Sequence, residues 1–384
     1  MKNSSRHILI VANTSWNIYN FRLNVIRLFI EKGYKVTVAA PVDEFIRYTE
    51  EFEDLIHIGL KHLDRDSINP FKDLRLIIEL YRLYQRLRPD LVLHYTVKPN
   101  IYGGIAARFA SVPSLAVITG LGYPFIHGGF PGKITSILYR ISNHFHRRII
   151  FENSDDLELF TSQNMLDPEK GFSIKGCGVD INYYNPDHSF RSNGKVTFTF
   201  IGRLLYDKGI REFIEAAHLV KAQNPDVRFW LIGQIDEENP AAIKKSDLVE
   251  WVKDPNIDYL GSKEDVRPYI MKSDCIVLPS YREAIARSVT EAMSMAKPVI
   301  GTDTAGLREA IVDKVNGYLV EVKNPIALAR AMLDFISLST EDRAEMGRKG
   351  RMKVEAEFDD VKIAREIWNL SKDLLPKHDK SSSI

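Results

Sequence analysis

Strand and helix signals alternate along both halves of the chain, and this alternation is the feature that most constrains the fold. In the first half, short apolar runs suited to buried strands lie at 8–12, 35–40, 91–95 and 115–119. Longer segments with helical periodicity, such as 19–31 and 70–88, stand between them. Strands joined by crossover helices pair in parallel. The pattern therefore predicts an α/β fold with doubly wound parallel sheets.

A polar, turn-forming segment at 185–194 interrupts the alternation, which then resumes. The strands expected after it lie at 197–201, 228–232, 257–260, 275–278 and 298–301. A chain of 384 residues exceeds the roughly 250–300 residues at which single cores stop growing. We therefore expect two Rossmann-like domains, residues 1–187 and 195–358, and a disordered tail from residue 379.

Composition places the chain among soluble globular proteins, with 45% hydrophobic and 27% charged residues. The two cysteines, Cys177 and Cys275, form no disulfide framework and fit a reducing compartment. The apolar run near the N-terminus is too short for a signal-peptide core or a membrane span. We expect a cytoplasmic protein.

Charge is distributed unevenly although the net charge is only +1. No acidic residue occurs between Asp90 and Glu152, whereas that stretch contains Lys98, Arg108, Lys133, Arg140, Arg147 and Arg148. Such asymmetry indicates an anionic partner. No nucleic-acid-binding motif accompanies it, so we expect a membrane surface and no nucleic acid.

One predicted helix in this stretch has two stripes. The apolar stripe, which we expect to be a core face, consists of Ile134, Ile137, Leu138, Ile141 and Phe145. The basic stripe beside it consists of Lys133, Arg140, His144 and Arg147. A basic edge next to an apolar one suits a helix that lies on an anionic membrane.

Two carboxylates and two cations stand at strand-to-helix turns of the second half. Glu283 and Glu291 are eight positions apart, while Arg203 and Lys208 lie in Gly202-Arg203-x4-Lys208-Gly209. Cations suit a diphosphate and carboxylates suit hydroxyl groups, and helix N-termini add positive potential. This set predicts a binding site for a sugar nucleotide.

These motifs, together with Asp303-Thr304-Ala305-Gly306-Leu307-Arg308-Glu309, resemble the retaining glycosyltransferases of family 4. Segments 13–22, 98–103 and 119–123 are similar to the bacterial capsular-polysaccharide branch of that family. This branch includes the enzyme that adds α1,3-linked N-acetylgalactosamine to a lipid-linked N-glycan precursor. The resemblance covers nearly the whole chain and implies a GT-B fold, in which two Rossmann-like domains face a cleft.

The resemblance also implies an activity. We expect the protein to transfer a sugar from a nucleotide diphosphate, most simply UDP, to a polyprenyl-diphosphate-linked glycan on the inner face of the plasma membrane. Front-face departure and attack need no protein nucleophile, and two fixed cations replace a metal ion. No cofactor is therefore expected. A final helix at 361–378 would complete the first domain.

Residue roles follow from the same resemblance. Glu283, Arg203 and Lys208 would form the catalytic set, and Glu291 would hold the ribose. The other donor-binding candidates are Gly202, Ala284, Ile285, Ala286, Arg287, Ser288 and Asn17. The acceptor candidates are Thr119, Gly120, Gly122, Tyr123, His127 and Lys98. No metal site is predicted, and Asp64-Arg65-Asp66 is interpreted as a loop.

The sequence departs from the family at three places. Ala284 and Ala286 stand where relatives have glycine and proline, and a left-handed alanine would be strained by on the order of 1 kcal/mol. Thr119-Gly120 replaces a histidine of several relatives, and the first loop lacks paired glycines. The donor sugar therefore stays open. His94 is interpreted as a core residue rather than a functional one.

Two other functions remain possible from the residues alone. A nonhydrolysing UDP-sugar 2-epimerase shares the GT-B architecture but needs acid–base residues that the sequence does not display. A non-catalytic nucleotide-sugar-binding scaffold would explain Ala284 and Ala286.

Overall fold

The structure, a computed structural model, describes residues 6–64, 67, 69–122, 125, 128–186 and 195–376. The chain forms two compact units: Met1–Cys177 together with Val361–Ile384, and Gly178–Asp360. The division falls before the boundary expected at residue 187. Residues 178–186 belong to the second unit, because Val179 and Tyr184 are buried in its core.

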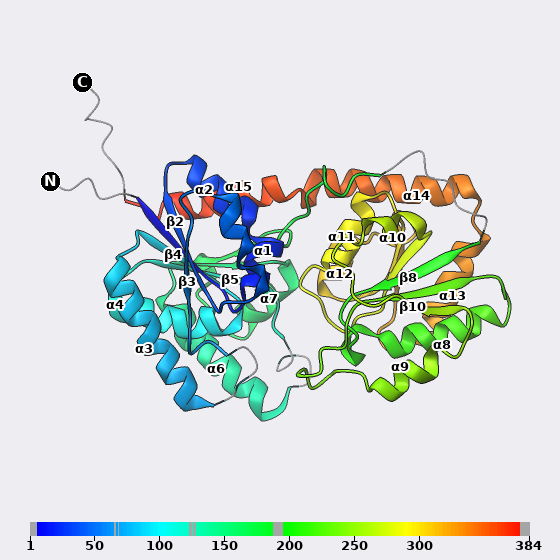
Figure 1. Ribbon diagram of the computed structural model, residues 1–384, viewed down its shortest axis with the longest axis horizontal. Helices are drawn as coiled ribbons and strands as arrows, with labels where there is room; N and C mark the ends of the chain where they lie inside the picture. The colour runs from blue at the N-terminus through cyan, green and yellow to red at the C-terminus, as the bar shows by residue number, and fades with distance from the viewer. Residues whose placement is uncertain are drawn as a thin grey trace, which may run out of the picture. The chain divides into compact units, whose positions relative to one another are not determined.

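The first unit contains a seven-stranded parallel sheet in the order β3-β2-β1-β4-β5-β6-β7 (Figure 1). Its strands are β1 (His7–Val11), β2 (Lys35–Ala40), β3 (Ile56–Gly59), β4 (Leu91–Tyr95), β5 (Ser114–Ile118), β6 (Arg148–Phe151) and β7 (Gly171–Ser173). All residues of β4 and β5 are buried, as expected for strands covered on both faces.

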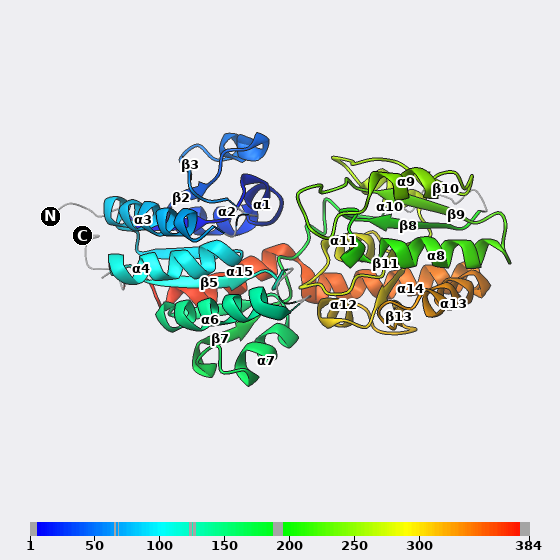
Figure 2. The ribbon, with the colours of Figure 1, turned by 90° about the horizontal axis from the view of Figure 1, so that it is seen from below.

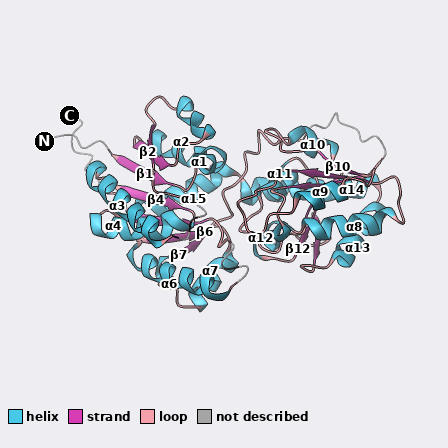
Figure 3. Ribbon diagram, turned by 60° about the horizontal axis from the view of Figure 1, so that its bottom comes forward, coloured by secondary structure: helices cyan, strands magenta, loops and turns pink. Residues whose placement is uncertain are grey.

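Helices cover both faces of this sheet (Figures 2 and 3). They are α1 (Ser15–Phe21), α2 (Leu23–Glu31), α3 (Pro70–Leu87), α4 (Gly104–Ala110), α6 (Gly129–Phe145), α7 (Ser154–Ser162) and α15 (Asp360–Lys372). Short helical turns lie at Glu44–Glu51, Pro99–Gly103 and Pro168–Lys170. α2 and α15 share one core with the sheet, whereas α3 and α4 pack on the opposite face. α15 joins the first unit through Ile363, Ala364 and Ile367.

The second unit contains a six-stranded parallel sheet in the order β10-β9-β8-β11-β12-β13. Its strands are β8 (Thr197–Ile201), β9 (Arg228–Ile232), β10 (Ile257–Tyr259), β11 (Cys275–Leu278), β12 (Val299–Thr302) and β13 (Gly317–Val320). Its helices are η4 (Tyr206–Lys208), α8 (Ile210–Lys221), α9 (Lys245–Trp251), α10 (Arg267–Lys272), α11 (Arg287–Ser294), α12 (Ala305–Ala310), α13 (Pro325–Ser337), α14 (Thr340–Lys353) and η5 (Val354–Phe358).

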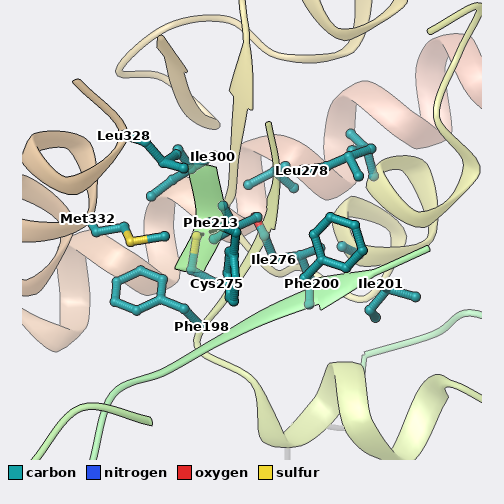
Figure 4. Close-up of a cluster of buried hydrophobic side chains, with 14 of the residues drawn as sticks. Phe198, Phe200, Ile201, Phe213, Cys275, Ile276, Leu278, Ile300, Leu328 and Met332 are labelled. Atoms are coloured by element: carbon teal, nitrogen blue, oxygen red, sulfur yellow. Dashed lines mark hydrogen bonds between the residues drawn. The ribbon is translucent and has the colours of Figure 1, made fainter. Parts of the chain in front are cut away.

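Aromatic side chains fill the centre of the second core. Phe198 stacks on Phe229 with ring centroids 5.9 Å apart, and Phe213 meets Phe200 at the same separation. Figure 4 shows Phe198, Phe200 and Phe213 beside Cys275 and Met332. This dry core holds the strands rigidly, so the loops that follow them start from fixed points. The predicted α/β class with parallel sheets is confirmed.

The prediction that the apolar stripe of α6 is a core face was wrong for most of its residues. Ile134, Ile137 and Ile141 are exposed, whereas the buried face of α6 carries Gly132, Tyr139, Ser142 and Asn143. Tyr139 packs edge-on against Phe160 at 5.2 Å, and the Asn143 amide donates to the carbonyl of Met165 at 3.1 Å. The inner face of α6 is thus partly polar, and most of the apolar stripe points outward. Within the described ranges, no helix has the length and apolarity needed to cross a bilayer.

Two buried histidines lie under α4, as expected for His94. His94 Nε2 is 2.7 Å from Tyr84 Oη, while His146 lies between Ser114 Oγ (2.9 Å) and the Asn100 carbonyl (2.8 Å). Burial lowers the pKa of His146 to about 4 and holds the pKa of His94 well below its usual value. Both imidazoles are therefore neutral in the folded protein.

The neutral histidines predict loss of stability in acid. In the unfolded chain both titrate near 6.5, so the unfolded state binds more protons below that pH. The free energy of unfolding should fall as the pH decreases from 6.5 toward 4, by on the order of 2–3 kcal/mol for His146 and further through His94. Urea titrations at several pH values measure this loss.

His146→Gln keeps one donor and one acceptor but cannot be protonated, so its loss of stability over that pH range should be smaller. The exposed His144→Gln, in the last turn of α6, is the control. If the His146→Gln and wild-type proteins lose equal stability, the buried histidines are not the acid-sensitive groups.

Candidate active site

The candidate residues of the second unit follow neighbouring strands at one edge of the sheet. Gly202-Arg203 follows β8, the 279–286 loop follows β11, and Asp303 follows β12. Because these strands are parallel neighbours, their carboxyl ends meet at the same edge. Ligands of open α/β sheets bind at such an edge.

Lys208 and Glu283 form an ion pair across two of these loops. Lys208 Nζ lies 2.5 Å from Glu283 Oε1, and both side chains are mostly shielded from solvent. The loops approach closely at Gly209, where a Cβ atom would lie 2.0 Å from the Pro279 carbonyl oxygen. Gly209 also has φ +72°, which favours glycine. The pair thus places a cation and a carboxylate together at the start of α8.

Arg203 is held by a residue that the sequence reading missed. Its Nη1 lies 2.6 Å from Asp236 Oδ2, and the arginine side chain is 46% exposed. The Gly202 N–H donates to the Ile232 carbonyl at 3.0 Å, which fixes the backbone before the arginine. Asp236 follows β9, the strand next to β8, so strand order is the signal that could have found it.

Glu291 is buried on α11 with two partners. Arg287 Nε lies 2.7 Å from its Oε1, and the hydroxyl of Tyr184 hydrogen-bonds to the carboxylate. Burial raises the pKa of Glu291, while the charge of Arg287 and both hydrogen bonds favour the ionised form. The helix begins after Ala286, which makes no side-chain cap bond, and Ser288 lies in its first turn.

Ala284 does not adopt the left-handed conformation in which an alanine would be strained. Non-glycine residues with positive φ occur at seven described positions, and Ala284 is not one of them. The close backbone approach lies instead at Gly306, where a Cβ atom would be 1.7 Å from the Ala284 carbonyl oxygen. The Gly306 N–H also donates to the Glu283 carbonyl at 3.2 Å. Ala286 is buried in the core and the partly buried Ile285 packs against that core, so neither side chain offers a ligand a polar group.

A hydrogen bond between Tyr281 and Glu212 joins the loop of Glu283 to the start of α8. The sequence analysis did not predict this contact. Tyr281 Oη donates to Glu212 Oε1 at 2.7 Å, and the Tyr281 N–H donates to the Asp207 carbonyl at 2.8 Å. Ser280 Oγ donates to the same carbonyl at 3.2 Å. These bonds tie the loop of Glu283 to η4, which carries Lys208. Glu212 lies four residues after Lys208 in the first turn of α8, a placement that sequence spacing alone does not reveal.

Asn17, the donor candidate of the first unit, lies in a buried polar cluster. Its Oδ1 accepts from Arg22 Nε at 3.5 Å, and Arg22 pairs with Glu152 at 3.1 Å. The guanidinium also lies 4.2 Å from the centre of the Tyr95 ring. These side chains join the carboxyl ends of β4 and β6 to α1. The cluster fixes the position of α1 after the first strand. The pairing of Arg22 with Glu152 was not predicted from the sequence.

The acceptor candidates are only partly placed. Lys98 Nζ donates to the Ser67 carbonyl at 2.6 Å and to Asp73 Oδ1 at 2.8 Å, so the amine has protein partners. Gly120 (φ +118°) and Gly122 (φ +71°) adopt backbone conformations that favour glycine after β5 and Thr119. Tyr123 and His127 lie outside the described residues, as do Arg65 and Asp66. The described residues contain no cluster of three metal-ligating side chains.

Comparison with known proteins agrees with this geometry. Residues 7–153 match the family model described as glycosyl transferase 4-like, and residues 185–353 match glycosyl transferases group 1. The sequence is 29% identical over 349 residues to the N,N'-diacetylbacillosaminyl-diphospho-undecaprenol alpha-1,3-N-acetylgalactosaminyltransferase of Campylobacter jejuni, covering 86% of this chain and 89% of that one. It is 27% identical to the Escherichia coli UDP-Gal:alpha-D-GlcNAc-diphosphoundecaprenol alpha-1,3-galactosyltransferase, covering 80% and 82%.

The fold is also that of solved glycosyltransferase structures. Anabaena HepE in complex with UDP and glucose superposes with a TM-score of 0.76 at 20% identity, over 95% of this chain and 99% of that one. Two Rossmann-like units with this strand-end set of cations and carboxylates define a glycosyltransferase of the GT-B class. The chain is a member of this class, with a glycosyl transferase 4-like amino-terminal part and a glycosyl transferases group 1 carboxyl-terminal part. The expected family is confirmed.

Loss of the Tyr281 hydroxyl should impair sugar transfer more than it impairs folding. Tyr281→Phe removes the bond to Glu212, so Glu283 and Lys208 lose one constraint on their alignment. We expect kcat to fall about tenfold, the equivalent of one hydrogen bond to a charged group, with little change in KM for the donor. Tyr48→Phe, which loses a 2.6 Å bond to His57 in the other unit, should keep wild-type kcat. A wild-type kcat in Tyr281→Phe would show that this bond does not align the site.

Proposed function

We propose that the protein is a retaining glycosyltransferase that moves a hexose or N-acetylhexosamine from a UDP-sugar to a polyprenyl-diphosphate-linked glycan. The product would enter a bacterial surface polysaccharide or a glycoprotein glycan. The relatives named for transfer to undecaprenol-diphosphate-linked sugars support this substrate class. The observation that carries the proposal is the Lys208–Glu283 pair beside Arg203 and Glu291 at one sheet edge.

Each side chain has a role that its surroundings support. Lys208 and the half-exposed Arg203 face the donor diphosphate, whose charge competes with Glu283 and Asp236 for them. Glu291, ionised through Arg287 and Tyr184, accepts hydrogen bonds from the ribose hydroxyls. Glu283 contacts the hydroxyls of the transferred sugar.

Catalysis then rests on charge stabilisation and alignment. The bond between the anomeric carbon and the diphosphate breaks, and negative charge grows on the leaving phosphate. Lys208 and Arg203 stabilise that charge, and the phosphate takes the proton of the attacking acceptor hydroxyl on the same face of the sugar. This path retains the anomeric configuration without a protein nucleophile.

The acceptor class sets the location. A polyprenyl carrier is anchored in the bilayer, so we place the enzyme on the inner face of the plasma membrane as a peripheral protein. The epimerase and scaffold alternatives gain no support from the relatives, whose names all describe sugar transfer in the cases above. Incubation with UDP-sugars, with and without lipid-linked acceptor, separates transfer from epimerisation and from binding without turnover.

Two substitutions should weaken UDP binding through different contacts. Glu291→Ala removes the ribose partner and Arg203→Ala removes a diphosphate partner. Each should cost about 1.5–3 kcal/mol, the usual range for a hydrogen bond to a charged group. Glu283→Ala should spare UDP affinity while it lowers transfer, because its contact is with the sugar. Calorimetric titration with UDP measures the affinities.

Lys245→Ala is the control, because it removes an exposed ion pair with Glu237 on the same unit. Wild-type UDP affinity in both Glu291→Ala and Arg203→Ala would refute the assignment of the donor site.

Transfer should not require a metal ion. Arg203, Lys208 and the uncapped N-terminus of α11 carry the diphosphate charge in this proposal. We expect full activity in the presence of excess EDTA, measured as product formed from UDP-sugar and lipid-linked acceptor. Complete loss of activity that Mg²⁺ or Mn²⁺ restores would contradict metal independence.

A further inference from the structure

The outward face of α6 is a stripe of exposed apolar side chains. Phe130, Ile134, Ile137 and Ile141, the α6 stripe, are spaced at intervals of three or four residues, so they share one side of the helix. Their exposed fractions are 76%, 42%, 54% and 46%. The buried residues Gly132, Tyr139, Ser142 and Asn143 lie on the opposite side. The helix thus turns its most apolar side away from the fold.

The neighbouring helices extend this apolar surface. α4 packs against both α3 and α6, so the three helices form one layer on the sheet (Figure 2). Phe109 of α4 is 71% exposed, and α3 exposes Phe71, Leu74, Ile78 and Tyr81. On α3 these four residues also recur every three or four positions, opposite the buried Leu76, Leu80 and Leu83. Exposed apolar side chains on helices that pack together favour an interaction site.

The charges around the layer select the partner. Lys133 and Arg140 are exposed on α6, Arg147 is exposed just beyond its end, and no acidic residue occurs from 91 to 151. On α3, Arg75, Arg82 and Arg86 line a groove of about 680 Å³ together with Lys61 and the carboxylate of Glu79, which accepts from the N–H groups of Lys61 and His62. An apolar stripe flanked by cations matches the interface of an anionic bilayer, where apolar side chains enter the headgroup region and cations meet lipid phosphates.

We propose that the outer face of the α3–α4–α6 layer docks on an anionic lipid bilayer, with the α6 stripe inserted among the headgroups. This face would hold the enzyme at the membrane location proposed above. Docking through it does not depend on the donor site. The apolar stripe supplies the part of the affinity that survives high salt, because burial of apolar area is not screened. The cations supply the salt-sensitive part and the preference for anionic lipid.

The test compares three variants of the full chain. The stripe variant is Ile134→Ser/Ile137→Ser/Ile141→Ser, and the basic variant is Lys133→Glu/Arg147→Glu. Arg140 is kept because it donates to the Gln163 carbonyl at 3.1 Å. The matched control, Leu219→Ser/Val249→Ser/Ile326→Ser, removes equally exposed apolar side chains from the second unit. Co-sedimentation uses phosphatidylglycerol–phosphatidylethanolamine vesicles and, separately, phosphatidylcholine vesicles.

We expect the stripe variant to lose about tenfold or more in vesicle partitioning, with the remainder released by high salt. The basic variant should lose its preference for phosphatidylglycerol but keep salt-resistant binding. The control should bind as wild type does. Calorimetric titration with UDP should give the same affinity in all variants, which separates failure of docking from failure of the donor site.

Two results would overturn the inference. One is a folded stripe variant that sediments with phosphatidylglycerol vesicles as well as wild type does. The other is a wild-type dimer, seen by sedimentation equilibrium without vesicles, that the stripe substitutions dissociate while vesicle binding is unchanged. In that case the α6 stripe is an interface between two copies of the chain.

Discussion

Close backbone approach at two glycines is the constraint on which the candidate site depends. At Gly209 and Gly306 a side chain would occupy the space of the Pro279 and Ala284 carbonyl oxygens. These contacts hold η4 and α12 against the two ends of the loop that carries Glu283. The polar bonds of Tyr281 and Ser280 then fix the orientation of that loop. Without the backbone contacts, Lys208 and Glu283 would have no shared position in which to meet.

Much of this arrangement could be predicted from the sequence, because strand pattern determines it. Short buried runs separated by helices specify parallel sheets, and parallel sheets bring strand ends together. The meeting of Arg203, Lys208, Glu283 and Glu291 at one edge follows from those two rules. The partners of these residues do not follow from them. Asp236 depends on the spatial order of β8 and β9, and Glu212 depends on the direction in which α8 leaves its loop.

The faces of α6 show a second limit of sequence reasoning. Periodicity finds an apolar stripe but not the direction in which it points. Here Tyr139 and Asn143 find aromatic and carbonyl partners inside the unit, so the core accepts the polar side of the helix. The isoleucines are left outside. An amphipathic helix is therefore ambiguous until the shape and polarity of the surface beneath it are known.

The glycine at position 306 also bears on how such chains are recognised. A sequence pattern that demands glycine immediately after the first glutamate would score this chain as defective at Ala284. In this structure the backbone approach that excludes a side chain falls at Gly306, where the Ala284 carbonyl oxygen occupies the space of a Cβ atom. That oxygen belongs to the backbone, so the requirement for glycine lies on α12 whatever side chain stands at position 284. A search that gives its weight to the loop position alone will undervalue sequences of this kind.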